Sequence, residues 1–205
     1  MVVTRTRIEF EQDIADFRLF VARIEGVTPL LMNNPRHSMG NGGAVSATRK
    51  SVPKPEEEAA TKLYRHPDGW LYIGADHVRE SMLWASKGLR VNRKPLQPLL
   101  AASLFIIDEY FPLTRNGQLL YEPDRIDIRR AVVQRQGVLR ARGLIDVPWQ
   151  AEVRFQYDAS IITNPEIMVQ VLKEAGMRIG ILDYRPQKGG VFGRFAVAEA
   201  WVESL

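Results

Sequence analysis

A regular alternation of apolar and polar side chains around residue 150 is the clearest pattern in the chain. From Trp149 to Asp158 every second residue is apolar, and the residues between them are Gln, Glu, Arg, Gln and Asp. This period predicts a strand with one buried face. The runs from Phe17 to Glu25 and from Phe195 to Glu203 are rich in aromatic and small apolar residues, and we predict a first and a last strand there.

Two segments carry the signals of helices. One begins near Ala75, repeats apolar residues on one face, and ends before Gly88. The other begins with Asn164 as N-cap and Pro165 at the first helical position, and Gly176 is predicted as its C-terminal stop. Four tryptophans lie on apolar faces and are predicted to be core residues: Trp70, Trp84, Trp149 and Trp201.

Three segments are less regular. Residues 33–60 contain many Pro, Gly and Asn residues and predict a long mobile loop inserted in the domain, with a short helix starting at Glu56. In residues 92–113 the apolar run fits a helix or a strand, and both remain open. Residues 115–118 contain the Asn-Gly signal of a hairpin.

Arginine is concentrated between residues 125 and 142, at Arg125, Arg129, Arg130, Arg135, Arg140 and Arg142. β-branched residues between them indicate strands, with breaks at Gly137 and Gly143. Because side chains alternate between the two faces of a strand, Arg140 and Arg142 share one face. This segment is predicted to form a basic stripe that binds phosphates; a solvated strand face is the alternative.

The order of predicted elements is β-α-β-β-α-β once residues 92–113 are set aside. It indicates an α+β fold, a ferredoxin-like (RRM/RAMP-type) split βαβ with a long loop insertion, in a single domain over residues 1–205. In this topology two helices cover one face of a four-stranded sheet. The open face is the one that RNA-recognition modules use.

Charge and composition narrow the class of protein. The 205 residues carry a formal net charge of +4, which favours polyanions over acidic partners, and there is no cysteine to form a disulfide or a zinc–thiolate site. The N-terminus lacks the apolar core of a signal peptide, and no apolar run approaches the ~18 residues that would span a bilayer. We therefore expect a cytoplasmic protein with no membrane partner.

A glycine-rich basic segment from Asp183 to Phe195 precedes the last predicted strand. Its candidate nucleic-acid-binding residues are Tyr184, Arg185, Lys188, Gly189, Gly190, Phe192, Gly193 and Arg194. Glycines let backbone N–H groups approach an anion, and the two aromatic rings would stack on a base. A flexible hairpin loop, with the aromatic rings packed beneath it, is the alternative interpretation.

The spacing of these motifs resembles the RAMP superfamily of CRISPR proteins, especially its backbone subunits and compact phage-borne relatives. The residues that carry the resemblance are Gly26-Val27-Thr28-Pro29-Leu30 after the first strand, Tyr72-Ile73-Gly74 before the first helix, and Gly193-Arg194-Phe195 near the end. The Ser-Ser-Leu-Lys core of the family's helix-entry motif is absent.

The resemblance implies single-stranded RNA or DNA as partner, with copies of the protein lying side by side along the strand, alone or with other subunits of a ribonucleoprotein. The inserted loop, with Arg49 and Lys50, would reach the neighbouring copy as a thumb. Family members that cleave RNA use an acidic residue in the loop after the first strand. Residues 31–55 contain no Asp or Glu, which argues against cleavage by that route.

Catalytic chemistry has little support in the sequence. The three histidines show no metal-ligand spacing, there is no Walker-type motif, and Glu56 to Glu58 fit a solvated helix start. We predict no enzyme activity, no metal and no cofactor. Two alternatives remain: a RAMP-type endoribonuclease that uses His37 or His66, and a structural or assembly subunit whose arginines pair with acidic partners.

Overall fold

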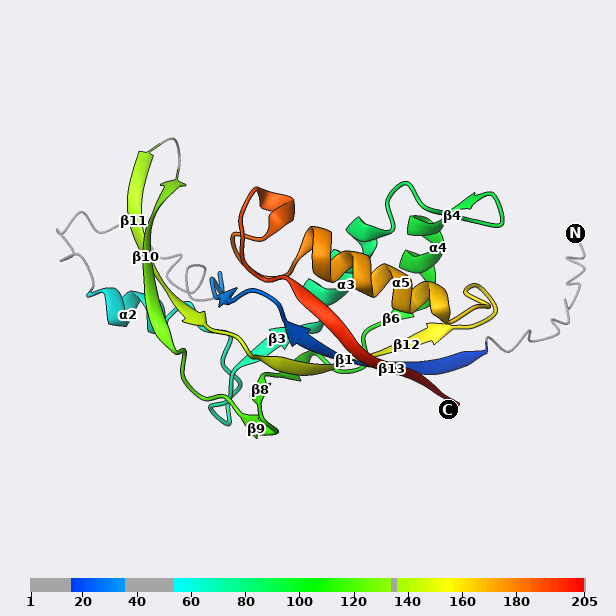
Figure 1. Cartoon of the computed structure of the whole chain (residues 1–205), viewed down its shortest axis with the longest axis horizontal. Coiled ribbons are helices and arrows are strands. Elements are labelled where there is room, and N and C mark those ends of the chain that lie inside the picture. The colour runs from blue at the N-terminus through cyan, green and yellow to red at the C-terminus, as the bar shows by residue number, and fades with distance from the viewer. Residues whose placement is uncertain (1–15, 36–53, 134–135, 205) are drawn as a thin grey trace, which may run out of the picture.

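A computed structural model describes residues 16–35, 54–133 and 136–204 of the chain. Its main sheet is antiparallel, with β1 between β13 and β12 (Figure 1). These strands are β1 (Phe17–Gly26), β12 (Gln150–Asp158) and β13 (Phe195–Ser204). All three were predicted from the alternation of apolar residues, and all three predictions are confirmed.

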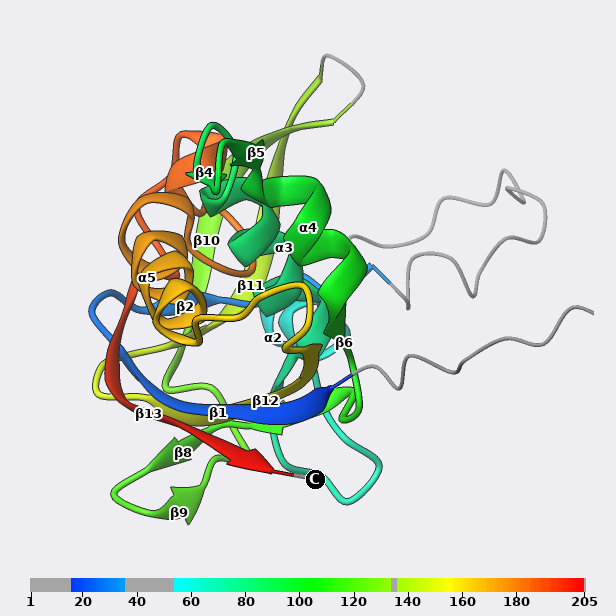
Figure 2. The ribbon, with the colours of Figure 1, turned by 90° about the vertical axis from the view of Figure 1, so that its right-hand side faces the viewer.

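Helices cover one face of this sheet and form the core with it. Phe20, Ile24, Val153 and Phe155 point to this face and are fully buried. The helices are α3 (Ala75–Ala85), α4 (Leu96–Ser103) and α5 (Glu166–Glu174), all on the same side of the sheet in Figure 2. The chain is therefore a mixed α/β protein with antiparallel sheets, as the α+β prediction required.

Short strands extend the sheet beyond β12. β6 (Leu104–Phe105) and β8 (Thr114–Arg115) pair with opposite ends of β12, and β9 (Gln118–Leu119) pairs with β8. β3 (Tyr72–Gly74) pairs with β7 (Tyr110–Pro112). The predicted Asn-Gly hairpin is confirmed, because Asn116 and Gly117 both have positive φ. The ambiguous apolar run is a helix, α4, followed by a strand, β6.

The arginine-rich segment forms a separate hairpin that projects from the body in Figure 1. β10 (Arg125–Val133) pairs with β11 (Gln136–Ile145), and β2 (Leu30–Leu31) pairs with the end of β11. The predicted breaks at Gly137 and Gly143 are wrong, because β11 runs through both. The absence of a side chain at Gly143 leaves room for the Leu63 side chain, which lies 2.5 Å from where a Cβ would be.

Part of the predicted mobile insertion is ordered. Residues 55–60 form helix α2 (Pro55–Ala60), as expected from Glu56 onward. The Glu58 carboxylate accepts hydrogen bonds from the Ala141 N–H at 3.2 Å and from Arg140 at 3.1 Å, so α2 is fixed to the edge of β11. Arg49, Lys50 and His37 lie outside the described residues.

The helix after β12 ends later than predicted. Asn164 accepts a hydrogen bond from the Glu166 N–H at 3.0 Å, but the N-cap is Pro165, one residue later than predicted, and the helix begins at Glu166. Gly176 does not end the helix, which continues as a π-helical turn, Ala175–Ile179, up to Gly180 at φ 75°. A side chain at position 176 would overlap the Phe195 carbonyl of β13, so this glycine allows the helix to lie against the sheet.

Only one tryptophan is a fully buried core residue. Trp149 is 0% exposed, and its indole N–H donates to the Thr28 carbonyl at 2.9 Å. Trp70 and Trp201 are partly exposed, and Trp84 is 41% exposed at the end of α3. The prediction of a core role was wrong for Trp84, because its apolar neighbours in the sequence belong to the opposite side of the helix. Within the described ranges, no helix combines the length and apolar character needed to cross a membrane.

Arg115 joins three loops at the edge of the sheet and provides a test of this arrangement. It donates to both Asp124 carboxylate oxygens at 2.7 Å and to the Asp146 and Pro148 carbonyls at 2.8 Å. We expect Arg115→Gln to lower the free energy of unfolding by roughly 2–3 kcal/mol at pH 7, measured by urea denaturation. The loss of the charged hydrogen bonds leaves the half-buried Asp124 carboxylate without its partner.

The pH dependence of this loss has a defined sign. The hydrogen bond from Arg115 lowers the pKa of Asp124 below its ordinary value. A carboxyl group with a lowered pKa in the folded state stabilises the protein above its pKa in the unfolded state, which is about 4. This stabilisation is lost as the pH falls through its pKa in the folded state. The difference between wild type and Arg115→Gln should therefore shrink below pH 4. Arg18→Gln is the control, since its exposed pair with Asp16 should contribute little; equal losses in both variants would contradict the prediction.

Candidate nucleic-acid interface

The glycine-rich segment forms a tightly hydrogen-bonded loop between the π-helical turn and β13. The N–H groups of Gly189, Gly190 and Gly193 donate to the carbonyls of Pro186, Arg185 and Pro29 at 2.9, 3.0 and 2.9 Å. They are therefore not available to a phosphate. Because the chain already uses these N–H groups, the loop conformation argues against the prediction that they contact a nucleic-acid backbone.

Two of these glycines are required by packing of the loop against itself. A side chain at Gly190 would overlap the Tyr184 carbonyl, and one at Gly193 would overlap the Ile181 carbonyl. Gly189, at φ 75°, has nothing within 4 Å of the position where a Cβ would lie. The glycines thus allow backbone segments to approach each other, and only Gly189 faces open space.

The arginine hairpin and the loop converge, as the sequence predicted, but they bind each other. The Arg129 guanidinium carbon lies 5.1 Å from the Tyr184 ring centroid and 4.7 Å from that of Phe192. Both oxygens of Asp127 accept from the same guanidinium, one of them at 2.6 Å, and this hydrogen bonding lowers the pKa of Asp127. The two aromatic rings predicted to stack on a base hold an arginine instead.

Four further predicted arginines are also engaged within the chain. Arg140 pairs with Glu58 at 3.1 Å, Arg142 with Asp183 at 3.1 Å, and Arg185 with Glu80 at 3.6 Å. The Arg194 side chain donates to the Met177 carbonyl. An ion pair leaves little net charge for an external phosphate, so these contacts mainly fix the hairpin and the loop to each other and to α2 and α3.

Two predicted residues keep an unpaired charge. Arg130 and Lys188 are exposed and have no carboxylate partner within the described part of the chain. Arg135 lies outside the described residues. The predicted site therefore keeps fewer available cations than its sequence suggests.

The sequence reasoning missed a second basic cluster, here called the basic hairpin, in residues 87–94. β4 (Arg90–Val91) and β5 (Lys94–Pro95) form a two-residue hairpin, with Asn92 and Arg93 at positive φ. Its cations are Lys87, Arg90, Arg93 and Lys94, all exposed and none paired with a described carboxylate. Four cations within eight residues and no acidic residue among them were a visible signal.

A groove next to the basic hairpin adds an aromatic ring and further cations. This basic groove, with a volume of about 570 Å³, lies between the end of α3 and α5 with its π-helical turn, and is lined by Trp84, Lys87, Lys173 and Arg178. The Lys87 ammonium lies 5.2 Å from the Trp84 ring, and Glu174 in the same groove pairs with Arg178 at 2.9 Å. An exposed indole beside cations is the combination that proteins use to stack bases while neutralising phosphates.

The outer face of the main sheet has the opposite character. Arg23 and Arg154 share it with four carboxylates, those of Glu25, Glu152, Glu199 and Glu203. Figures 1 and 2 both place the glycine loop and β4 on the helix side of the sheet, away from β8 and β9. The excess of carboxylates disfavours phosphate on the open face, where the sequence analysis had placed RNA. The helix side is the better candidate.

Of the two candidate catalytic histidines, His66 is the one that lies within the described residues. His66 stacks on Trp70 at 4.0 Å between ring centroids, and its Nδ1 accepts from the Asp68 N–H at 3.2 Å, so it stabilises a turn. Among the described residues no three His, Asp or Glu side chains are close enough together to hold a metal ion.

Comparison with known proteins adds information about the fold. No family model and no curated protein matches the chain. A chain in the cryo-EM structure of the Type III-B Cmr-beta bound to cognate target RNA matches with a TM-score of 0.56 and 10% identity, over 92% of this chain and 61% of the other. This chain thus spans about three-fifths of the length of the chain it matches. The likeness is one of fold.

Proposed function

We propose that the protein binds single-stranded nucleic acid, RNA in the first place, as a non-catalytic subunit of a cytoplasmic ribonucleoprotein. The observation that carries the proposal is the row of unpaired cations on the basic hairpin, next to the exposed indole of Trp84. The similarity to a chain of an RNA-bound complex supports RNA over DNA as the first ligand to test.

The arrangement suits binding with weak sequence preference. The four cations of the basic hairpin would neutralise successive phosphates, and Trp84 would stack on one base between them. Arg130 on β10 and Lys188 in the glycine loop would supply two further cations. Because none of these contacts reads the hydrogen-bonding edge of a base, we expect little discrimination between sequences.

The topology supports a ferredoxin-like fold of RAMP type. β1, β12 and β13 occupy the order of the first, third and fourth strands of a split βαβ, and α3 and α5 lie on one face. The short strands β6 and β8 would take the place of the second strand. We include in the proposal that copies of the protein, or other subunits, lie side by side along the strand.

A binding assay tests the function. Fluorescence anisotropy with a labelled 20-nucleotide RNA, the matching DNA strand and an RNA duplex should show preferential binding of the single strands, with affinity that falls steeply between 50 and 200 mM salt. An affinity that does not change with salt concentration, or binding of the duplex as tight as that of the single strands, would overturn the proposal. Products with 2′,3′-cyclic phosphate ends after incubation would show instead that the protein is an endoribonuclease.

Trp84 provides a more specific prediction. Base stacking on an aromatic side chain contributes about 1–3 kcal/mol, so Trp84→Leu should weaken RNA binding by roughly fivefold or more. Trp201→Leu is the matched control, because Trp201 is also partly exposed and lies beside a cation, Arg23 at 5.4 Å, but on the acidic face. Anisotropy titrations of both variants decide the matter. Equal weakening by the two substitutions would argue against a stacking role for Trp84.

A further inference from the structure

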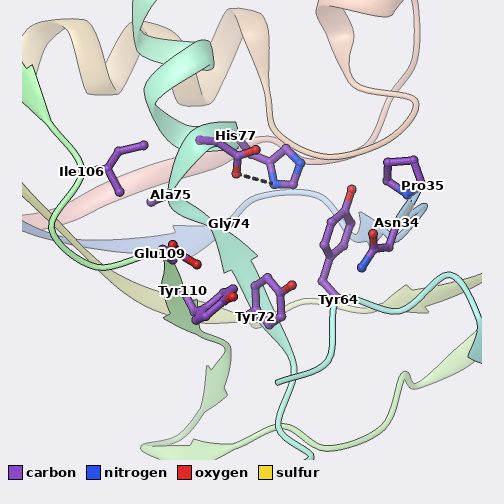
Figure 3. Close-up of a pocket in the computed structure, with 11 residues that line it drawn as sticks. Asn34, Pro35, Tyr64, Tyr72, Gly74, Ala75, His77, Ile106, Glu109 and Tyr110 are labelled. Carbon is purple, nitrogen blue, oxygen red and sulfur yellow. Dashed lines mark ion pairs between the residues drawn. The ribbon is translucent and has the colours of Figure 1, made fainter. Parts of the chain in front are cut away.

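A second cavity, of about 390 Å³, opens at the other end of α3, away from Trp84. It is bounded by β3, the first turn of α3, β7 and residues 34–35. Figure 3 shows three tyrosine rings along one side, the His77 imidazole across from them, and the Glu109 carboxylate at one end. Since α3 has 11 residues, its two ends are separated by roughly 16 Å. This cavity is therefore separate from the basic groove.

Aromatic rings form most of its walls. The Tyr64 ring lies 5.8 Å from Tyr72 and 4.9 Å from His77, and the Tyr72 ring lies 4.6 Å from Tyr110, all at steep interplanar angles. Tyr64 and Tyr72 are almost fully buried, so their positions are fixed by the core. Ring faces and edges set at such angles make a rigid, partly apolar enclosure for a flat or compact group.

Among the described residues, the acidic and basic side chains that line the cavity are two carboxylates and one histidine. Asp76 and Glu109 line the cavity, and the described residues of its lining include no Lys or Arg. The positive end of α3 also borders the cavity, but Asp76 in the first turn balances it, and the Ala75 N–H already donates to the Glu109 carbonyl at 3.0 Å. Phosphate is thus disfavoured here, and a cation is favoured.

We infer that this cavity binds the guanidinium group of an arginine that a partner protein presents. Aromatic faces attract cations, and a planar guanidinium both stacks on rings and forks onto carboxylates, which an ammonium group cannot do. The charge complementarity of Asp76 and Glu109 selects the arginine side chain over a neutral nucleobase. The partner would be a protein with an exposed arginine, docked at the end of α3 opposite to the basic groove.

The test uses Nα-acetyl-L-arginine methylamide as probe and its citrulline analogue as neutral control of the same shape. In NMR titrations of the full chain, the arginine probe should shift the ring signals of Tyr64, Tyr72 and Tyr110 saturably, with at least tenfold weaker effects from citrulline. Cytidine and adenosine form the other arm. A nucleoside that binds more tightly than the arginine probe, or no saturable shift with arginine, would overturn the inference.

Two substitutions separate charge recognition from general effects on the protein. Glu109→Gln should weaken binding of the arginine probe about five- to tenfold, because it removes a carboxylate that would accept hydrogen bonds from the guanidinium. Since Glu109 is exposed, the substitution should not disturb the core. Glu57→Gln on α2 removes an exposed carboxylate that does not line the cavity and should change nothing. Unchanged binding in Glu109→Gln would contradict the site. RNA binding is unaffected in either outcome, so this inference stands or falls separately from the proposed function.

Discussion

Replacing all four cations of the basic hairpin by glutamine is expected to abolish most of the salt-sensitive affinity for single-stranded RNA. Each phosphate contact to a single strand adds about 0.7 to the slope of log affinity against log salt, so four contacts add about 3. Between 50 and 200 mM salt these contacts alone correspond to roughly a 50-fold change in affinity. Anisotropy titrations across this range should show a correspondingly flatter salt dependence for the variant.

A charge-matched control separates a local site from a general effect of net charge. Arg90→Gln with Lys94→Gln and Arg23→Gln with Arg154→Gln each remove two positive charges, the first pair from the basic hairpin and the second from the acidic sheet face. The first double variant should lower the salt slope by about 1.4, and the second should leave it almost unchanged. Similar losses in both would indicate that only the overall charge attracts RNA.

The strands of the main sheet could be predicted because their period is a local property. Trp149 to Asp158 alternates without a break, and the structure has β12 at Gln150–Asp158. Asn164 likewise predicts the start of its helix, because it lies two residues before α5 begins. The end of that helix could not be predicted, since Gly176 is explained by contact with Phe195, a residue in a different element.

The ion pairs of the arginine-rich segment could not be predicted for a similar reason. A sequence shows where arginines lie but not which carboxylates neutralise them. The partner of Arg142 is Asp183, and that of Arg140 is Glu58, both far away along the chain. The local density of arginine therefore predicts that the hairpin is basic, but it does not show that these charges bind carboxylates of the same chain.

The basic hairpin was accessible to sequence reasoning and was still overlooked. Its cations in residues 87–94 have no acidic residue between them, and Asn92 marks a turn. Freedom from nearby carboxylates is a more useful guide to a phosphate site than the number of arginines.

The glycine loop yields a prediction that separates a structural from a ligand-binding role. Gly193 and Gly189 have nearly the same φ, 72° and 75°, so an alanine at either position would take a positive φ that L-residues disfavour. Only at Gly193 would the added methyl group overlap a backbone atom, the Ile181 carbonyl oxygen. Gly193→Ala should therefore lose about 2–3 kcal/mol more unfolding free energy than Gly189→Ala, measured by urea denaturation.

The same pair of variants tests whether the loop touches nucleic acid. Since the Gly189 N–H donates to the Pro186 carbonyl at 2.9 Å, Gly189→Ala should keep the RNA affinity of the wild type. If Gly189→Ala remains stably folded and yet binds RNA tenfold more weakly, the backbone at this exposed turn approaches the strand, as the sequence first suggested. If the affinity is retained, the glycines serve the packing of the loop, and the basic hairpin and Trp84 remain the groups that contact the nucleic acid.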